Sequence, residues 1–232
     1  MGAFSPSRVG GWCAVAGSAL LLISVPLLVA LRPDGLPPLH TPLPDAMRTL
    51  QGHLLPFWIG EHLVLTAFFF LLGVAVWGAT HPLRERNRPL GWLALLAGGI
   101  AMLATALAFL WHAVLDPIFA SLYATHDPAA RAYLVQMATQ VDKVRSTLLL
   151  LGYLSIPWAF LFTVVHTAHR TAPLWWAWLS WTVVIAVALF PPVALAWSLP
   201  AGPIVLGKGV SLAAGDERSP SSRRRLRARA SP

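Results

Sequence analysis

Charged residues are scarce in this sequence. Only 11% of its 232 residues are Asp, Glu, Lys or Arg and 56% are hydrophobic, whereas a typical soluble domain has roughly 25% charged residues. Apolar stretches of 17 to 26 residues with almost no charge recur, and about 20 such residues cross the bilayer core as a helix. The alternating pattern of a membrane-spanning barrel is missing. We therefore predict an all-α fold, a polytopic transmembrane helical bundle.

Cysteine and catalytic motifs are also nearly absent. Cys13 is the single cysteine, which excludes an intramolecular disulfide and any metal or redox site of the C-x-x-C type. The sequence has no H-E-x-x-H, P-loop, G-x-S-x-G or nicotinamide-binding glycine pattern. A non-enzymatic role is therefore the favoured interpretation.

The apolar stretches predict one transmembrane domain, residues 1–214, followed by a polar tail, residues 215–232. Six spans are expected, at about 12–31, 57–80, 90–115, 147–167, 174–190 and 193–214. Five spans remain the alternative, because prolines and Lys208 weaken the last one.

Local signals refine the fourth span. Asp127 and Pro128 suit the cap and first position of a helix that runs through residues 129–146 into this span. Pro157 predicts a kink inside it.

Charge predicts the orientation. With the N-terminus inside, the N-terminal segment, the inner links and the tail carry 11 arginines, against five Lys or Arg in the two outer loops, in agreement with the positive-inside rule. The arginine-rich tail, 215–232, is expected to be disordered and cytoplasmic, and to be attracted to anionic lipid. No nucleic-acid-binding fold accompanies it. The excess of arginine over lysine, 15 to 2, hints at a GC-rich bacterial genome, so we expect a bacterial plasma membrane with both termini cytoplasmic.

Small residues mark the packing faces of the helices, because apolar surface gains little by leaving lipid. In the third span, small residues recur at the spacing of one helix face, at Ala94, Gly98, Ala101, Thr105 and Ala108. The same face continues through His112 and Asp116. The second span repeats the pattern with His62, Thr66, Phe69, Gly73 and Thr80, and the fourth with Gly152, Ser155, Ala159, Thr163 and His166.

Four ionisable residues on or beside these faces lie near the predicted outer surface and are the candidate site residues: Glu61, His62, His112 and Asp116. His166 lies at the opposite end of its span. Three hypotheses compete for them. They could be ligands of a transition metal, the two histidines could hold a haem from both sides, or the group could relay protons in a small transporter. The structural alternative is a polar collar in which His112 and Asp116 bond to each other and Asp116-Pro117 ends the helix.

A short basic link followed by RPLGWLALLAGGIAML, and later TAPLWWAWLSWTVVIAVALF, resembles the small six-helix integral membrane proteins of unknown function found in actinobacteria and related bacteria. The resemblance implies a fold and a membrane location, and it brings no activity, cofactor or site residue. Whether the chain forms a homo-oligomer or has a membrane partner stays open.

Overall fold

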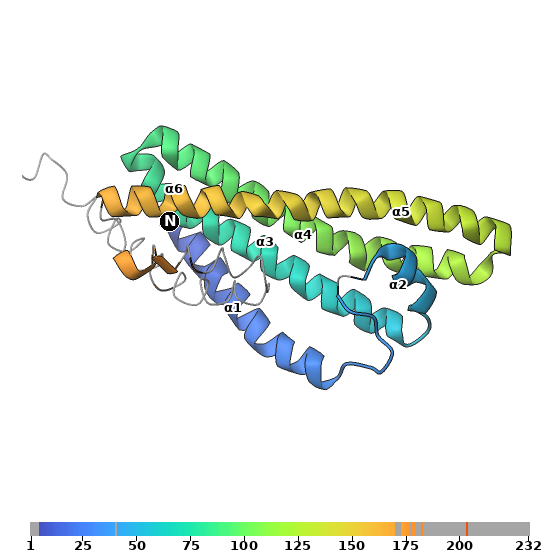
Figure 1. Ribbon diagram of the computed structural model, residues 1–232. Coiled ribbons are helices and arrows are strands. Elements are labelled where there is room, and N and C mark those ends of the chain that lie inside the picture. Colours follow the sequence, from blue (N-terminus) through green and yellow to red (C-terminus); the bar gives the residue numbers. More distant parts are fainter. Residues whose placement is uncertain are drawn as a thin grey trace, which may run out of the picture.

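The computed structural model describes residues 5–39, 41–169, 173–176, 178–179, 182 and 203. The elements it describes are helical throughout, with no strand in this part of the chain, and they form an elongated bundle (Figure 1). They are α1 (Pro6–Ala30), α2 (Leu43–Thr49), α3 (Leu54–Arg86), α4 (Arg88–Thr125), α5 (Pro128–Leu151), the 3₁₀ turn η1 (Gly152–Leu154) and α6 (Ser155–His169). The predicted all-α class is confirmed for these residues.

Four helical segments are long and apolar enough to cross a membrane, namely Pro6–Ala30, Leu54–Glu85, Arg88–Thr125 and Pro128–Val164. The first four predicted spans fall on them. Most of the predicted span at 174–190 and nearly all of that at 193–214 lie outside the described residues. The tail at 215–232 lies wholly outside them, as does the side chain of His166.

Glycines set the close crossing of α1 and α3. A Cβ atom built on Gly10 would lie 2.6 Å from the Cα of Gly78, which leaves no space for a side chain at either position. The Ser7 hydroxyl donates to the Gly78 carbonyl over 3.5 Å at the same crossing. Backbone contact through small residues is the usual way in which membrane helices associate.

The basic segment between the second and third predicted spans forms a helical hairpin. α3 continues through Pro82 to Arg86, and α4 begins at Arg88, with Asn87 as the connecting residue. The Asn87 side chain caps α4 by accepting from the Leu90 N–H at 3.3 Å, which satisfies one of the free donors of the first turn. The two helices then pack along their length.

Two further predictions concern the ends of helices. The suggestion that Asp116-Pro117 ends the third helix is wrong, because α4 continues through Pro117 to Thr125, where contacts with α2 and α5 support it. The predicted start at Asp127-Pro128 is confirmed: the Asp127 side chain accepts from the Ala130 N–H at 2.8 Å.

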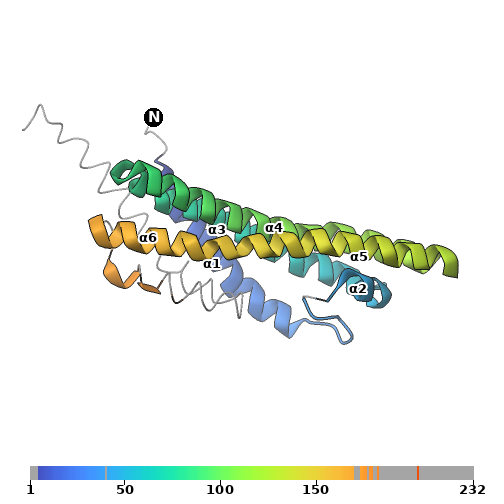
Figure 2. The same cartoon turned by 45° about the horizontal axis from the view of Figure 1, so that its top comes forward.

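Pro157 lies just after an irregular turn in the long helical segment formed by α5, η1 and α6. This segment packs beside α4 (Figure 2). The regular α-helix stops at Leu151, passes through η1 and resumes at Ser155. Pro157 has no N–H for the carbonyl four residues earlier and its ring crowds that turn, so the backbone tightens just before it.

Buried hydrophobic side chains form two separate clusters. The long cluster joins α1, α3, α4 and α6 around residues such as Phe68, Ala101 and Phe162. The cap cluster lies at the other end of the bundle, where α2, the start of α3 and the α4–α5 ends meet, and includes Met47 and Phe119.

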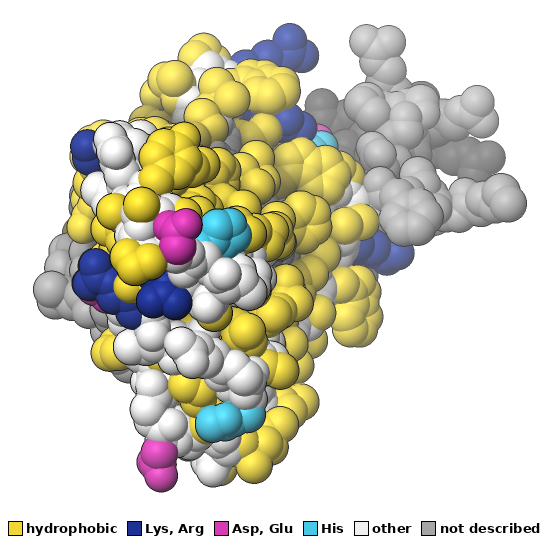
Figure 3. All heavy atoms as spheres, turned by 90° about the vertical axis from the view of Figure 1, so that its right-hand side faces the viewer, with side chains coloured by type: hydrophobic (Ala, Val, Ile, Leu, Met, Phe, Trp, Pro, Cys, Tyr) yellow, Lys and Arg dark blue, Asp and Glu magenta, His cyan; other side chains and the backbone are white. Residues whose placement is uncertain are grey.

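The surface changes character along the same axis. Charged, histidine and other polar groups gather on the end formed by α2 and the α4–α5 turn, and hydrophobic side chains cover the flanks (Figure 3).

Candidate functional site

A buried group of polar side chains lies where the two hydrophobic clusters adjoin. We call it the polar centre, and it consists of Trp58 and His62 on α3, His112 and Asp116 on α4, and Asp142 and Arg145 on α5. Each helix contributes a pair three or four positions apart, so both members of a pair point to the same side of their helix. Trp58, His62, His112, Asp116 and Arg145 are 0%, 0%, 3%, 1% and 6% exposed.

Asp116 accepts two hydrogen bonds through a single carboxylate oxygen. Its Oδ2 atom lies 2.9 Å from the indole Nε1 of Trp58 on α3, and the same oxygen lies 2.5 Å from Nδ1 of His112, one turn earlier on α4. The predicted bond between His112 and Asp116 is therefore present. Bonds to an ionised acceptor are roughly twice as strong as neutral ones, so this carboxylate holds α3 and α4 together.

Arg145 completes the polar centre from α5. Its Nη1 atom donates to Nε2 of His112, and its Nη2 atom donates to Oδ1 of Asp142 at 2.5 Å. The same Asp142 oxygen accepts from the Leu43 N–H of α2 at 3.3 Å. One guanidinium thus connects α5 with α4, and its carboxylate partner extends the connection to α2.

The two partners of His112 indicate its tautomer. An arginine can only donate and an ionised aspartate can only accept. We therefore assign Nε2 as the nitrogen that accepts from Arg145, and Nδ1 as the nitrogen that carries the hydrogen donated to Asp116. In this tautomer the imidazole uses both of its nitrogens.

His62 packs against His112 and has an unused nitrogen. The two ring centroids lie 4.6 Å apart, and Trp58 lies 4.2 Å from His62 on its other side. Nδ1 of His62 is 2.9 Å from the Trp58 carbonyl oxygen and donates to it. Its Nε2 atom is buried and has no hydrogen bond of standard geometry to the described residues, and the backbone of Leu39 is close to the ring.

Glu61, the fourth predicted residue, does not join the other three. It pairs with Arg32 at the end of α1, with 2.8 Å between Nη1 and Oε1, and Arg32 also donates to the Pro37 carbonyl. Glu61 is one position from His62, about 100° round the helix, so the two side chains serve different neighbours. The structure therefore brings together His62, His112 and Asp116 and places Glu61 in a separate ion pair.

The arrangement gives no support to the haem or metal hypotheses. Rings in direct contact at 4.6 Å leave no space for a haem that both histidines would bind from opposite faces. A metal on His112 would need the Nε2 lone pair that already accepts from cationic Arg145. Among the described residues, no group of three His, Cys, Asp or Glu side chains could hold a metal ion.

Sequence reasoning missed Trp58, Asp142 and Arg145. A signal for Arg145 does exist, because the buried residues Leu134 and Ala138 are followed at helical spacing by half-buried Val141 and then by Arg145. The apolar face of α5 therefore ends in a cation. Trp58 stands four positions before His62 and had no such marker.

Comparisons with protein-family models, with curated proteins and with solved structures find no match to this chain. The functional argument therefore depends on the polar centre and on the surface of the bundle.

Proposed function

We propose that this chain is a six-span protein of a bacterial plasma membrane, with both termini cytoplasmic, that acts as a non-enzymatic, proton-responsive component. The four apolar helices and the polar end of the bundle support the membrane part of the proposal. The excess of arginine in the predicted inner links supports the orientation.

One observation carries the functional part: His112 lies between an obligate acceptor, Asp116, and an obligate donor, Arg145. Histidine is the side chain that ordinarily changes charge between pH 5 and 8. Only the neutral ring satisfies both neighbours. A second proton on Nε2 would face the guanidinium with a donor and a positive charge, so the contact with Arg145 cannot survive protonation.

The polar centre lies toward the predicted outer end of the bundle. His112 lies roughly 36 Å along α4 from Arg88, at a rise of about 1.5 Å per residue. The hydrocarbon core of a bilayer is about 30 Å thick. If Arg88 marks the inner edge, His112 reaches the depth of the outer interface, with the cap cluster between it and the outer side.

The moving part is the contact between α5 and α4. When His112 gains a proton, Arg145 keeps its ion pair with Asp142 and α5 loses its bond to α4. Asp142 also holds the N–H of Leu43, so α2 moves with α5. Besides Asp116, Asp142 and Arg145, the ionisable neighbours of the ring are His62 in contact and the Glu61–Arg32 pair on the next face of α3. The closed form is therefore favoured at high pH and the open form at low pH.

A sensor fits the structure better than a proton-linked transporter. The long cluster lies between the polar centre and the end of the bundle near Arg88. Its apolar side chains separate His112 from that end.

A distance between α4 and α5 tests the proposal. Cys13→Ala gives a cysteine-free background, and spin labels at Ser121→Cys and Gln140→Cys occupy exposed positions on the two helices. Pulsed electron resonance in bilayers should give a shifted or broadened distance distribution at pH 5 relative to pH 8. His112→Gln, a neutral side chain that can both donate and accept, should keep the pH 8 distribution at both values.

His126→Gln is the matched control, because His126 is exposed at the end of α4, and it should retain the response. A wild-type distance that is the same at pH 8 and pH 5 would refute proton responsiveness. A response that persists in His112→Gln would assign it to another group and equally refute the proposal.

A further inference from the structure

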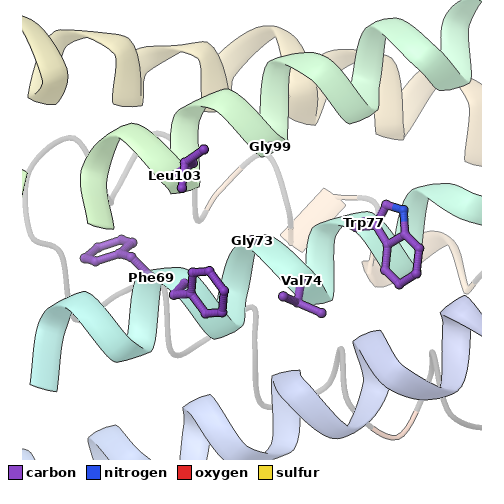
Figure 4. Close-up of a pocket in the computed structure, with 7 residues that line it drawn as sticks. Phe69, Gly73, Val74, Trp77, Gly99 and Leu103 are labelled. Carbon is purple, nitrogen blue, oxygen red and sulfur yellow. The ribbon is translucent and has the colours of Figure 1, made fainter. Parts of the chain in front are cut away.

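An apolar groove lies between α3 and α4, away from the polar centre (Figure 4). Its cavity volume is about 180 Å³, and it is lined by Phe70, Gly73 and Trp77 on α3 and by Gly99 and Leu103 on α4. A Cβ atom on Gly99 would meet nothing within 4 Å. The missing side chain of Gly99 therefore keeps the groove open.

The helix faces that line the groove continue to the side chain of Arg84. On α3, Phe70, Trp77 and Arg84 are seven residues apart, which is close to two full turns, so they share one face. On α4, Trp92 and Gly99 have the same spacing. Both lines end at one contact, where the guanidinium carbon of Arg84 lies 4.5 Å from the centroid of the Trp92 ring.

The groove is open to the surroundings of the bundle. Phe70, Trp77 and Leu103 are 58%, 36% and 52% exposed. From Phe70 to Arg84 the helix rises roughly 21 Å, which matches about 15 Å of hydrocarbon in one leaflet together with about 5–7 Å of its headgroup region. In the proposed orientation, this is the depth of an acyl chain in the inner leaflet, with its headgroup beside Arg84.

We propose that the groove and Arg84 together bind an anionic phospholipid, an inference that rests on the membrane insertion proposed above. One acyl chain lies against Phe70, Trp77 and Gly99, and the phosphate pairs with Arg84. Arg88, exposed at the start of α4, lies on the same hairpin and adds positive charge. Basic sites between helices on the cytoplasmic side are known to hold phosphate headgroups.

The test is native mass spectrometry of the full chain, purified in detergent and titrated with phosphatidylglycerol or with phosphatidylcholine of the same acyl chains. Wild type should retain phosphatidylglycerol in preference. Gly99→Leu, which fills the groove, should abolish this preference. Arg84→Gln should weaken phosphatidylglycerol binding about fivefold, the effect of one arginine near a charged headgroup.

Two matched variants control for folding and charge. Gly60→Leu adds the same side chain to α3 at another position where a Cβ meets nothing within 4 Å. Arg131→Gln removes a second arginine that packs on an aromatic ring, that of Tyr123, with 5.3 Å to its centroid. Both variants should bind phosphatidylglycerol like wild type.

Equal retention of the two lipids by wild type, or unchanged binding by Gly99→Leu, would overturn the lipid site. A photo-crosslinker at Leu103 should capture lipid; capture of residues 174–214 or of a second copy would assign the groove to protein and overturn it too. Membrane fractionation, done first, separates this failure from that of the proposed function, since a chain found outside the membrane would refute the membrane location itself.

Discussion

Arg145 on α5 donates to Nε2 of His112 on α4, across 33 positions of sequence. The opposite nitrogen of the same ring is bonded to Asp116, which also accepts from Trp58. Three long helices therefore meet at one neutral imidazole. Each prediction below removes or tests one part of this arrangement or of the bundle that holds it.

Asp116→Ala should destabilise the protein by about 3 kcal/mol. The substitution leaves the Trp58 indole and the His112 ring as buried donors without an acceptor, and a lost bond to a charged group is worth about 1.5–3 kcal/mol. Thermal unfolding in detergent measures the change.

Asp127→Ala is the comparison for that experiment. Asp127 caps the exposed start of α5, and loss of such a cap costs about 1 kcal/mol. Equal destabilisation by the two variants would show that Asp116 contributes no more than a surface cap.

Arg145→Met should destabilise by about 3 kcal/mol, the lower end of the range for breaking a buried ion pair, because the remaining Asp142 side chain is 20% exposed. Asp142→Asn alone should cost less. In the double variant no unpaired charge remains, so its destabilisation should fall short of the sum of the two single changes by about 1–3 kcal/mol. Chemical denaturation of the four proteins gives this coupling energy, and simple additivity would argue against a direct pair.

Gly78→Leu should prevent the normal packing of α1 on α3. A Cβ atom at Gly78 would lie 2.6 Å from the Cα of Gly10 and 2.8 Å from the Pro6 carbonyl oxygen, so the helices must separate, at about 1–3 kcal/mol or more. Gly60→Leu has open space on the same helix and should unfold at nearly the wild-type temperature. Similar unfolding temperatures for both variants would contradict the close crossing.

Reporter fusions test the orientation. A fluorescent reporter that matures only in the cytoplasm should be active after Asn87 or after Pro232. Alkaline phosphatase, which needs the periplasm, should be active after His126. A periplasmic signal from the fusion after Pro232 would rule out six spans with the N-terminus inside.

Helical periodicity predicted which side of the second and third spans faces the interior of the bundle. The stripe from Ala94 to Ala108 pointed His112 and Asp116 into the bundle, and both are buried. The same reasoning placed Glu61 with them, although Glu61 pairs with Arg32. Spacing along one helix gives the direction of a side chain, but its partner depends on the register between helices, which a single sequence does not contain.

The helix ends show the same limit. Asp127-Pro128 was predictable because a cap is a local interaction. The continuation of α4 through Pro117 was not, because contacts with α2 and α5 support that segment. Arg145 was counted among the outer-loop charges, although it is only 6% exposed, since its burial follows from how α5 packs on α4.

The most direct test of the central claim is the proton position on His112. Nitrogen-15 resonances of histidine-labelled protein in bilayers at pH 8 distinguish the two tautomers and the imidazolium, and His112→Gln identifies the signal by its loss. We predict a neutral ring with hydrogen on Nδ1 and an unprotonated Nε2 that accepts from Arg145. Hydrogen on Nε2, or a doubly protonated ring at this pH, would contradict the proton-responsive contact between α4 and α5.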